Sequence, residues 1–183
     1  MRIRIVATML CGVVLALGVP VSASAYVWTG YKWPSTSVKY FTSAVLTTTE
    51  KSYVTACATV WNNGPSAWTL TNSNTSGVYN GWSKTSFKAV GYPDIPGITD
   101  VKRSGTTVTE CDSFYNTDFS WNNSGVMDKA ARKCDYKTVI LHEFGHWIVL
   151  NEDTCHSTAV MWPNWTTKQA LTTTDKNGLD YVY

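Results

Sequence analysis

All three histidines of this chain lie in one short segment, LHEFGHWIVLNEDTCH, at residues 141–156. His142 and His146 are four residues apart, so on an α-helix their imidazoles lie on the same face and can bind one metal ion. Glu143 follows the first histidine and points to the side, close to a water held by that ion. The pattern H-E-x-x-H therefore predicts a helix here and a metal site on its surface.

The flanking residues also favour a helix. Asp135 is a good N-cap residue, and the predicted helix YKTVILHEFGHWIVL follows it and ends near Asn151. Gly145 in the middle of this helix costs about 1 kcal/mol relative to alanine, which indicates that something passes close to the helix at this point. The side chains expected to pack inward are those of Val139, Phe144, Trp147 and Ile148.

A catalytic zinc site needs three protein ligands and one open position. The ion lowers the pKa of a bound water towards about 7 and polarises a substrate carbonyl. Glu143 would take the proton of this water and pass it to a leaving amine. A five-residue pattern also occurs by chance, but the gathering of every histidine on one predicted helix favours a metal site.

Residues 1–25 are predicted to be a secretory signal peptide. MRIR is a short basic start, IVATMLCGVVLALGVPV is an apolar run, and Ala23 and Ala25 form an A-x-A cleavage pattern. The mature chain then begins near Tyr26 and has about 158 residues, enough for one domain with a single core. We expect residues 26–183 to be one domain of a secreted, extracellular protein that has no membrane anchor after cleavage.

The charge of the mature chain is balanced. Removing Arg2 and Arg4 from the 15 basic residues leaves 13, against 13 acidic ones, and no basic block remains. A nucleic-acid partner is therefore not expected. The nine Trp and ten Tyr are many for this length, and filling the core is their commonest role.

Four cysteines remain after removal of the signal peptide. An even number in an exported chain predicts two disulfides, and the sequence does not rank the three pairings. The cysteines are Cys57, Cys111, Cys134 and Cys155.

The rest of the mature chain carries strand and helix patterns. Thr47 and Glu50 form a capping box for a helix over residues 47–64, whose predicted buried face contains Val54, Cys57, Ala58 and Trp61. A short helix is expected at residues 172–183. The predicted strands are SVKYFT (37–42), AWTLTNSN (67–74), FKAVGY (87–92), TTVTECDSFY (106–115) and FSW (119–121). This order of elements indicates an α+β fold.

HEFGHW, followed by AVMWP at residues 159–163, resembles the metzincin zinc metallopeptidases, and their matrixin-like bacterial members most closely. The family pattern is H-E-x-x-H-x-x-G-x-x-H, followed by a turn whose methionine, the Met-turn methionine, lies beneath the metal. The likeness extends to residues 37–64, to SFYNTDFSW (113–121) where the family has its edge strand, and to the final predicted helix. It implies a small domain with a mixed, twisted sheet, an early helix, a zinc-site helix and a short C-terminal helix.

The resemblance also implies roles for individual residues. His142 and His146 would be ligands of one catalytic Zn²⁺, Glu143 the general base, and Met161 the Met-turn methionine.

Two positions depart from the family pattern. Val149 stands where the family has glycine, so the chain is not expected to turn off the helix in the usual way. The position of the third ligand falls on Glu152, and carboxylates do bind zinc. His156 is chemically the natural third ligand, although it comes ten residues after His146. We expect His156 to be the third ligand, with Glu152 or Asp153 as alternatives.

These features predict a secreted, monomeric zinc endopeptidase that binds an extended peptide or protein substrate along an edge strand near residues 113–121. The alternative is a catalytically degenerate protein of the same fold that acts as an exported binding module.

Ca²⁺ has no support from the sequence, because loop aspartates such as Asp94, Asp100 and Asp112 are common. A third, weaker hypothesis is glycan binding through Trp28, Trp33 or Trp82.

Overall fold

The structure is a computed structural model that describes residues 27–73, 80–87 and 91–183. The predicted signal peptide, residues 1–25, lies outside this part of the chain. No helix within these ranges is both long and apolar enough to cross a membrane. The elements are β1 (Ser37–Thr42), α1 (Thr48–Asn62), β2 (Thr69–Asn72), β3 (Gly81–Thr85), β4 (Gly97–Ser104), β5 (Thr107–Asn116), β6 (Ser120–Asn122), β7 (Lys133–Asp135), α2 (Tyr136–Trp147) and α3 (Thr173–Val182).

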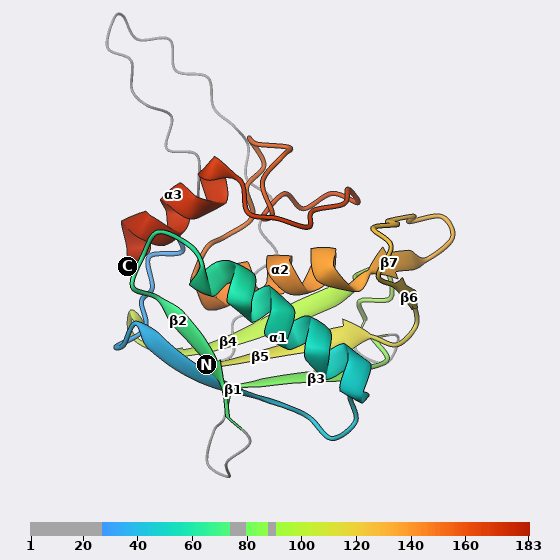
Figure 1. The fold of residues 1–183 in the computed structure, drawn as a ribbon, viewed down its shortest axis with the longest axis horizontal. Coiled ribbons are helices and arrows are strands. Elements are labelled where there is room, and N and C mark those ends of the chain that lie inside the picture. Colours follow the sequence, from blue (N-terminus) through green and yellow to red (C-terminus); the bar gives the residue numbers. More distant parts are fainter. Residues whose placement is uncertain (1–26, 74–79, 88–90) are drawn as a thin grey trace, which may run out of the picture.

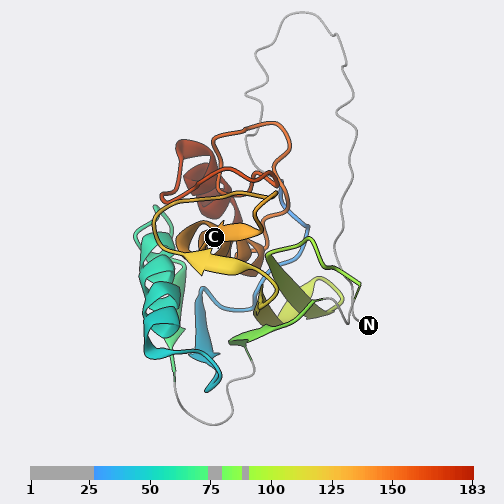
Figure 2. The ribbon, with the colours of Figure 1, turned by 90° about the vertical axis from the view of Figure 1, so that its right-hand side faces the viewer.

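The main sheet is mixed and has the strand order β2-β1-β3-β5-β4. β1 is parallel to β2 and β3, and β3 is parallel to β5, whereas β4 is antiparallel to β5 and forms one edge. Figure 1 shows α1 and α2 on the same side of this sheet. In Figure 2, where the molecule is turned by 90°, the two helices also lie next to each other. The predicted α+β class is confirmed.

The edge strand differs from the prediction. Residues 113–116 of SFYNTDFSW belong to β5, which is paired on both sides by β3 and β4. β4 forms the edge, and it was not predicted because its sequence GITDVKRS has no clear alternation and most of its side chains are half-buried. The prediction of an edge strand at 113–121 is therefore wrong.

One other predicted strand is not formed as expected. Residues 88–90 of FKAVGY lie outside the described residues, while Phe87 and Gly91 occupy a bend and a turn.

α1 follows its sequence signals closely. Thr47 is the N-cap, and the capping box with Glu50 is present. The side chains of the predicted buried face of α1 and those expected to pack inward from α2 are all buried. Trp61 on α1 donates a hydrogen bond from Nε1 to the carbonyl of Leu141 on α2 at 3.0 Å. Because this bond joins the two helices in the core, it fixes their relative position along the sheet.

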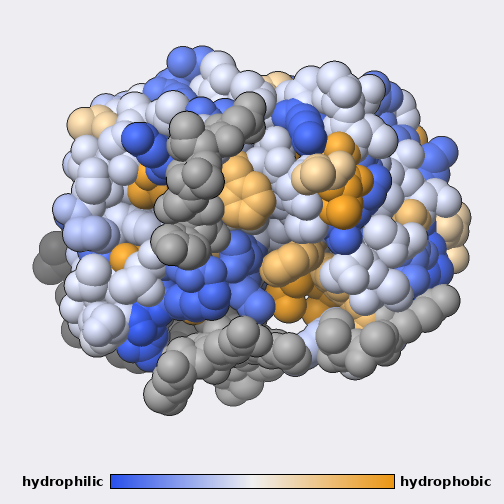
Figure 3. Space-filling model, turned by 90° about the horizontal axis from the view of Figure 1, so that it is seen from below, coloured by the Kyte–Doolittle hydropathy of each residue, from blue (hydrophilic) through white to orange (hydrophobic). Residues whose placement is uncertain are grey.

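Tryptophans fill the core between the helices and the sheet. Trp61, Trp68, Trp82 and Trp147 are fully buried. Of the three tryptophans considered for glycan binding, Trp33 and Trp82 are 8% and 0% exposed, and Trp28 alone is exposed, at 40%. The face seen from below in Figure 3 carries pale and hydrophilic residues with separate hydrophobic areas among them. The three tryptophans therefore do not form a common glycan-binding surface.

The four cysteines of the described chain form no disulfide. Cys57, Cys111 and Cys134 are fully buried on α1, β5 and β7, whereas Cys155 is exposed in the loop after α2. Burial raises the pKa of the Cys57 and Cys134 thiols to about 12. The buried three pack as small apolar groups on separate elements, so the two predicted disulfides are not formed in the structure.

A buried carboxylate on α1 joins this helix to β3 and to α2. Glu50 accepts hydrogen bonds from Lys84 Nζ on β3 at 2.9 Å and from Tyr136 Oη on α2 at 3.0 Å, in addition to the backbone N–H of Thr47. Burial raises the pKa of this carboxyl, but the hydrogen bonds from Lys84, Thr47 and Tyr136 outweigh it and hold the pKa below its ordinary value of 4.5. The ionised carboxylate therefore stabilises the folded state.

We predict that Glu50→Gln lowers the free energy of unfolding by about 2 kcal/mol at pH 7, because hydrogen bonds to a charged group are lost. A depressed folded-state pKa gives stability that is present above about pH 4.5 and is lost as the pH falls through the folded pKa. Urea unfolding should therefore show the wild type and the variant converging at pH 3. Asp180→Asn, at an exposed position of α3, serves as the control. A gap that persists or widens in acid would contradict the prediction.

Candidate metal centre

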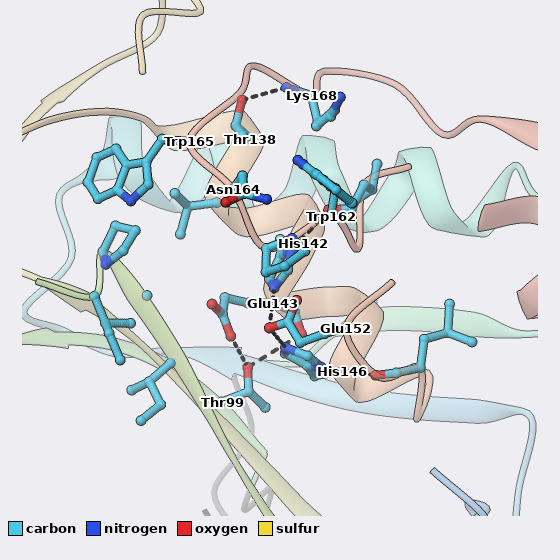
Figure 4. A pocket seen from close by; sticks show the side chains of 18 of the residues that line it. Thr99, Thr138, His142, Glu143, His146, Glu152, Trp162, Asn164, Trp165 and Lys168 are labelled. Atoms are coloured by element: carbon cyan, nitrogen blue, oxygen red, sulfur yellow. Dashed lines mark hydrogen bonds and ion pairs between the residues drawn. The ribbon is translucent and has the colours of Figure 1, made fainter. Parts of the chain in front are cut away.

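Two histidines of α2 converge with a glutamate from the loop that follows it. Nε2 of His142 lies 3.3 Å and Nε2 of His146 lies 3.7 Å from Oε1 of Glu152. In the described part of the chain this is the one group of three or more His, Cys, Asp or Glu side chains whose ligand atoms all lie within 4.8 Å of one another. Figure 4 shows Glu152 between the two imidazoles.

Backbone carbonyls orient both imidazoles. Nδ1 of His142 lies 2.9 Å from the carbonyl of Val160, and Nδ1 of His146 lies 3.0 Å from the carbonyl of Leu150. A carbonyl oxygen only accepts hydrogen bonds, so in each ring Nδ1 carries the proton and donates it. In the neutral form of each ring the lone pair is then on Nε2, the atom that faces Glu152, where a metal would take the place of a proton.

The charges of the cluster favour a cation. Burial raises the pKa of the Glu152 carboxyl, but His142 and His146 lower it below its ordinary value. Burial disfavours protonated His142, yet Glu152 and Glu143 raise the pKa of His142 to about 9. The second carboxylate oxygen of Glu152, Oε2, is buried and has no hydrogen-bond partner. Burying a carboxylate oxygen without a partner costs free energy, and a cation bound to Oε2 would reduce that cost.

His156, the predicted third ligand, lies outside this cluster. Its Nδ1 is 2.9 Å and 3.0 Å from the two carboxylate oxygens of Asp153, which also accepts the backbone N–H groups of Cys155 and His156. Asp153 is buried and closes the turn that contains these residues. The structure therefore brings Glu152 to the two histidines, and it brings neither His156 nor Asp153. The register of six residues after His146 was the signal that pointed to Glu152.

α2 ends in a left-handed turn. The helix stops at Trp147, earlier than the predicted end near Asn151. Val149 has φ +65°, and the N–H groups of Val149 and Leu150 donate to the carbonyls of His146 and Gly145. These bonds form the Schellman motif, in which glycine usually takes the left-handed position. The chain therefore turns off the helix here as a glycine-containing chain would, contrary to the expectation from Val149.

Segments from earlier and from later in the sequence hold the residues that follow this turn. The N–H of Thr29 donates to the carbonyl of Val149 at 3.1 Å, and the N–H of Asn151 donates to the carbonyl of Val27 at 2.6 Å. On α3, the buried carboxylate of Asp175 accepts the N–H of Val160 at 2.9 Å. The carbonyls and the glutamate that surround the histidines are thus fixed by contacts distant in sequence.

Met161 lies directly beneath α2. A Cβ added at Gly145 would overlap the sulfur of Met161, so only glycine permits this approach. Met161 is buried, together with Ala159 and Val160. The close passage expected from a glycine in the middle of the helix is confirmed.

Glu143 lies beside the cluster and faces β4. It is 5% exposed, and its Oε2 accepts a hydrogen bond from Thr99 Oγ1 at 2.7 Å. A Cβ added at Gly97 would lie 2.8 Å from Oε1 of Glu143 and 2.6 Å from Val139 Cγ1, so a glycine is required where β4 meets α2. Sequence analysis missed Gly97 and Thr99 because β4 itself was not predicted. The available signal in the sequence was Gly97, the glycine that begins the half-polar segment GITDVKRS.

A cleft of about 300 Å³ opens over these side chains. Its walls are β4, α2 and the loop at residues 162–168, which contributes Trp162 and Trp165. The cluster and Glu143 line the cleft together, as Figure 4 shows. A ligand in the cleft would therefore meet both.

The aspartates considered for Ca²⁺ are not gathered in loops. Asp100 and Asp112 are paired across β4 and β5, and Asp94 forms an ion pair with Arg132 at 3.0 Å.

No protein-family model matches the chain, and no curated protein matches it.

The left-handed turn gives a stability prediction. Val149→Gly should be more stable than Val149→Ala, although glycine is ordinarily the worse replacement by about 0.5–1 kcal/mol. The left-handed conformation costs roughly 1–2 kcal/mol for a residue with a Cβ and little for glycine. The same pair of substitutions at Val54, buried within α1, should show the ordinary order. Urea unfolding of the four variants tests this, and a more stable Val149→Ala would refute it.

Proposed function

We propose that the chain is a secreted zinc-dependent endopeptidase of the metzincin, matrixin-like type. The observation that carries the proposal is the convergence of His142, His146 and Glu152 in a cleft that also contains Glu143. Imidazole nitrogens and a carboxylate oxygen form one of the ligand sets of catalytic zinc. The anchored Nδ1 atoms and the unpartnered Oε2 of Glu152 support the fit.

The chemistry divides between the ion and Glu143. When bound, zinc would acidify a water and polarise the carbonyl of the scissile bond. The Glu143 carboxylate would accept the proton of that water and return it to the leaving amine. Its position next to His142 in sequence, facing the cleft rather than the core, suits this role because the base must reach the reacting water without binding the metal.

β4 offers the substrate an edge. The N–H of Asn116 donates to the carbonyl of Pro96, so these two residues form a hydrogen-bonded pair. Antiparallel pairs alternate, and the register then turns the N–H and C=O groups of Gly97, Thr99 and Val101 away from β5. An extended peptide could pair with these groups and pass over the cluster. This supports an endopeptidase, since a strand-like site can bind the middle of a chain.

The case for an exported binding module without catalysis is weaker. It rested on Val149 and on the missing third histidine, but Val149 makes the required turn and Glu152 reaches the two histidines. The position of Glu143 in the cleft also favours catalysis.

Zinc affinity tests the ligand set. Glu152→Gln should weaken zinc binding by more than the roughly 10- to 100-fold that losing an outer hydrogen-bond partner of a ligand costs. His156→Gln should have a smaller effect, because His156 contacts Asp153 and lies outside the cluster. Competition with a chromophoric chelator gives both affinities for the purified mature chain. The reverse order would make His156 the third ligand.

Hydrolysis of an unfolded protein tests the reaction. Glu143→Gln should bind zinc as the wild type does and lose activity by roughly 10²- to 10⁴-fold, the contribution of general acid–base catalysis. Glu110→Gln is the matched control, because Glu110 lies on β5 and does not line the cleft. Folded, zinc-loaded wild type that cleaves nothing would refute the proposal, as would a fully active Glu143→Gln.

A further inference from the structure

A buried chain of hydrogen bonds ends on Glu143. Trp147 Nε1 donates to Ser113 Oγ at 2.7 Å, Ser113 Oγ and Thr99 Oγ1 are 2.6 Å apart, and Thr99 Oγ1 donates to Glu143 Oε2 at 2.7 Å. Trp147 and Ser113 are fully buried. The chain starts on α2, crosses β5 and β4, and returns to α2, so it ties the helix to the edge of the sheet.

The groups at the two ends determine the donor and the acceptor of every hydrogen bond in this chain. The indole N–H of Trp147 can only donate, and the ionised carboxylate of Glu143 can only accept. Ser113 therefore accepts from Trp147 and donates to Thr99, which leaves the Thr99 proton for Glu143. Each hydroxyl has one proton, and the Thr99 proton is directed to Oε2 of Glu143 at 2.7 Å, because the other acceptor within reach, the backbone carbonyl of Glu143, is more distant at 3.4 Å.

Thr99 also faces the proposed substrate. Its side chain points to α2, while its backbone N–H and C=O lie among those that β4 directs away from β5. Gly97, two residues earlier, allows β4 to approach Glu143 closely. One residue therefore contacts the general base and belongs to the strand on which an extended peptide would bind.

We infer that Thr99 is a positioning residue, which holds the Glu143 carboxylate at a fixed place relative to the edge of β4 through the buried chain from Trp147 and Ser113. The inference rests on the proposed function. A peptide paired with β4 would then present its scissile carbonyl at a constant distance from the base. Oε2 is held by Thr99, and Oε1 is left for proton transfer.

Kinetics of two substitutions test the inference. Thr99→Val keeps the shape of the side chain and removes the hydroxyl, and it should lower kcat roughly 10- to 100-fold because a 1 Å misplacement of a catalytic group can cost about that much. KM should stay close to that of the wild type, since the backbone of β4 is unchanged. Thr99→Ser retains the hydroxyl and should restore most of kcat. Thr109→Val, at an exposed position of β5, is the matched control and should behave as the wild type.

Two readouts do not depend on turnover. Zinc content should be unchanged in Thr99→Val, because Thr99 contacts none of the three proposed ligands. A crystal structure of this variant should show the Glu143 carboxylate displaced by more than about 0.5 Å, the tolerance for productive catalytic geometry. If Thr99→Val does not fold, Thr99→Ala compared with Thr99→Ser gives the same test.

The outcomes separate the two proposals. An active wild type with unchanged kcat in Thr99→Val, or an equal loss in Thr99→Ser, would overturn the positioning role alone. An inactive, zinc-loaded wild type would refute the endopeptidase instead. In that case the position of Glu143 in the Thr99→Val crystal structure still decides whether the hydroxyl holds the carboxylate.

Discussion

The chain leaves α2 through a left-handed turn at Val149, and the geometry of the candidate metal centre depends on it. The turn places the carbonyl of Leu150 against His146 Nδ1. It also reverses the direction of the chain, so that Glu152 lies against the face of α2 that carries the two histidines. A β-branched residue in this conformation is strained, by an amount on the order of 1–3 kcal/mol. Contacts made by Thr29 and Gly145 with the turn offset that strain.

The candidate metal centre also requires that α2, which carries both histidines and Glu143, is held rigidly in the fold. Asp135 caps α2, Trp61 binds the carbonyl of Leu141, and Met161 fills the space that Gly145 leaves. The hydroxyl chain from Trp147 adds a connection from α2 through the sheet. Because these contacts approach the helix from several sides, the two histidines and Glu143 have fixed positions relative to the cleft, which is the condition for a preorganised site.

Local signals predicted what local interactions determine. The capping box of Thr47 and the spacing of the apolar residues gave α1, and H-E-x-x-H gave the helix and two of the three clustered residues. Contacts between distant segments were not predictable in this way. β4 was missed because its residues are half-buried in a cleft wall, and Glu152 ranked below His156 because ligand chemistry was weighed above position. Three of the cysteines are buried on separate elements and the fourth is exposed in a loop, a result that an even count does not reveal.

The residues around Glu152 are held by Thr29 from one part of the sequence and, through Val160, by Asp175 from another. Contacts of such large sequence separation form late in folding, because loop-closure entropy must be overcome first. α2 and the turn at Val149 are closed by local hydrogen bonds and can therefore form before the contacts with Val27 and Thr29 fix the position of Glu152. The proposed metal centre would reach its final geometry only when these distant segments have docked, so partly folded chains would bind a cation more weakly than the native chain.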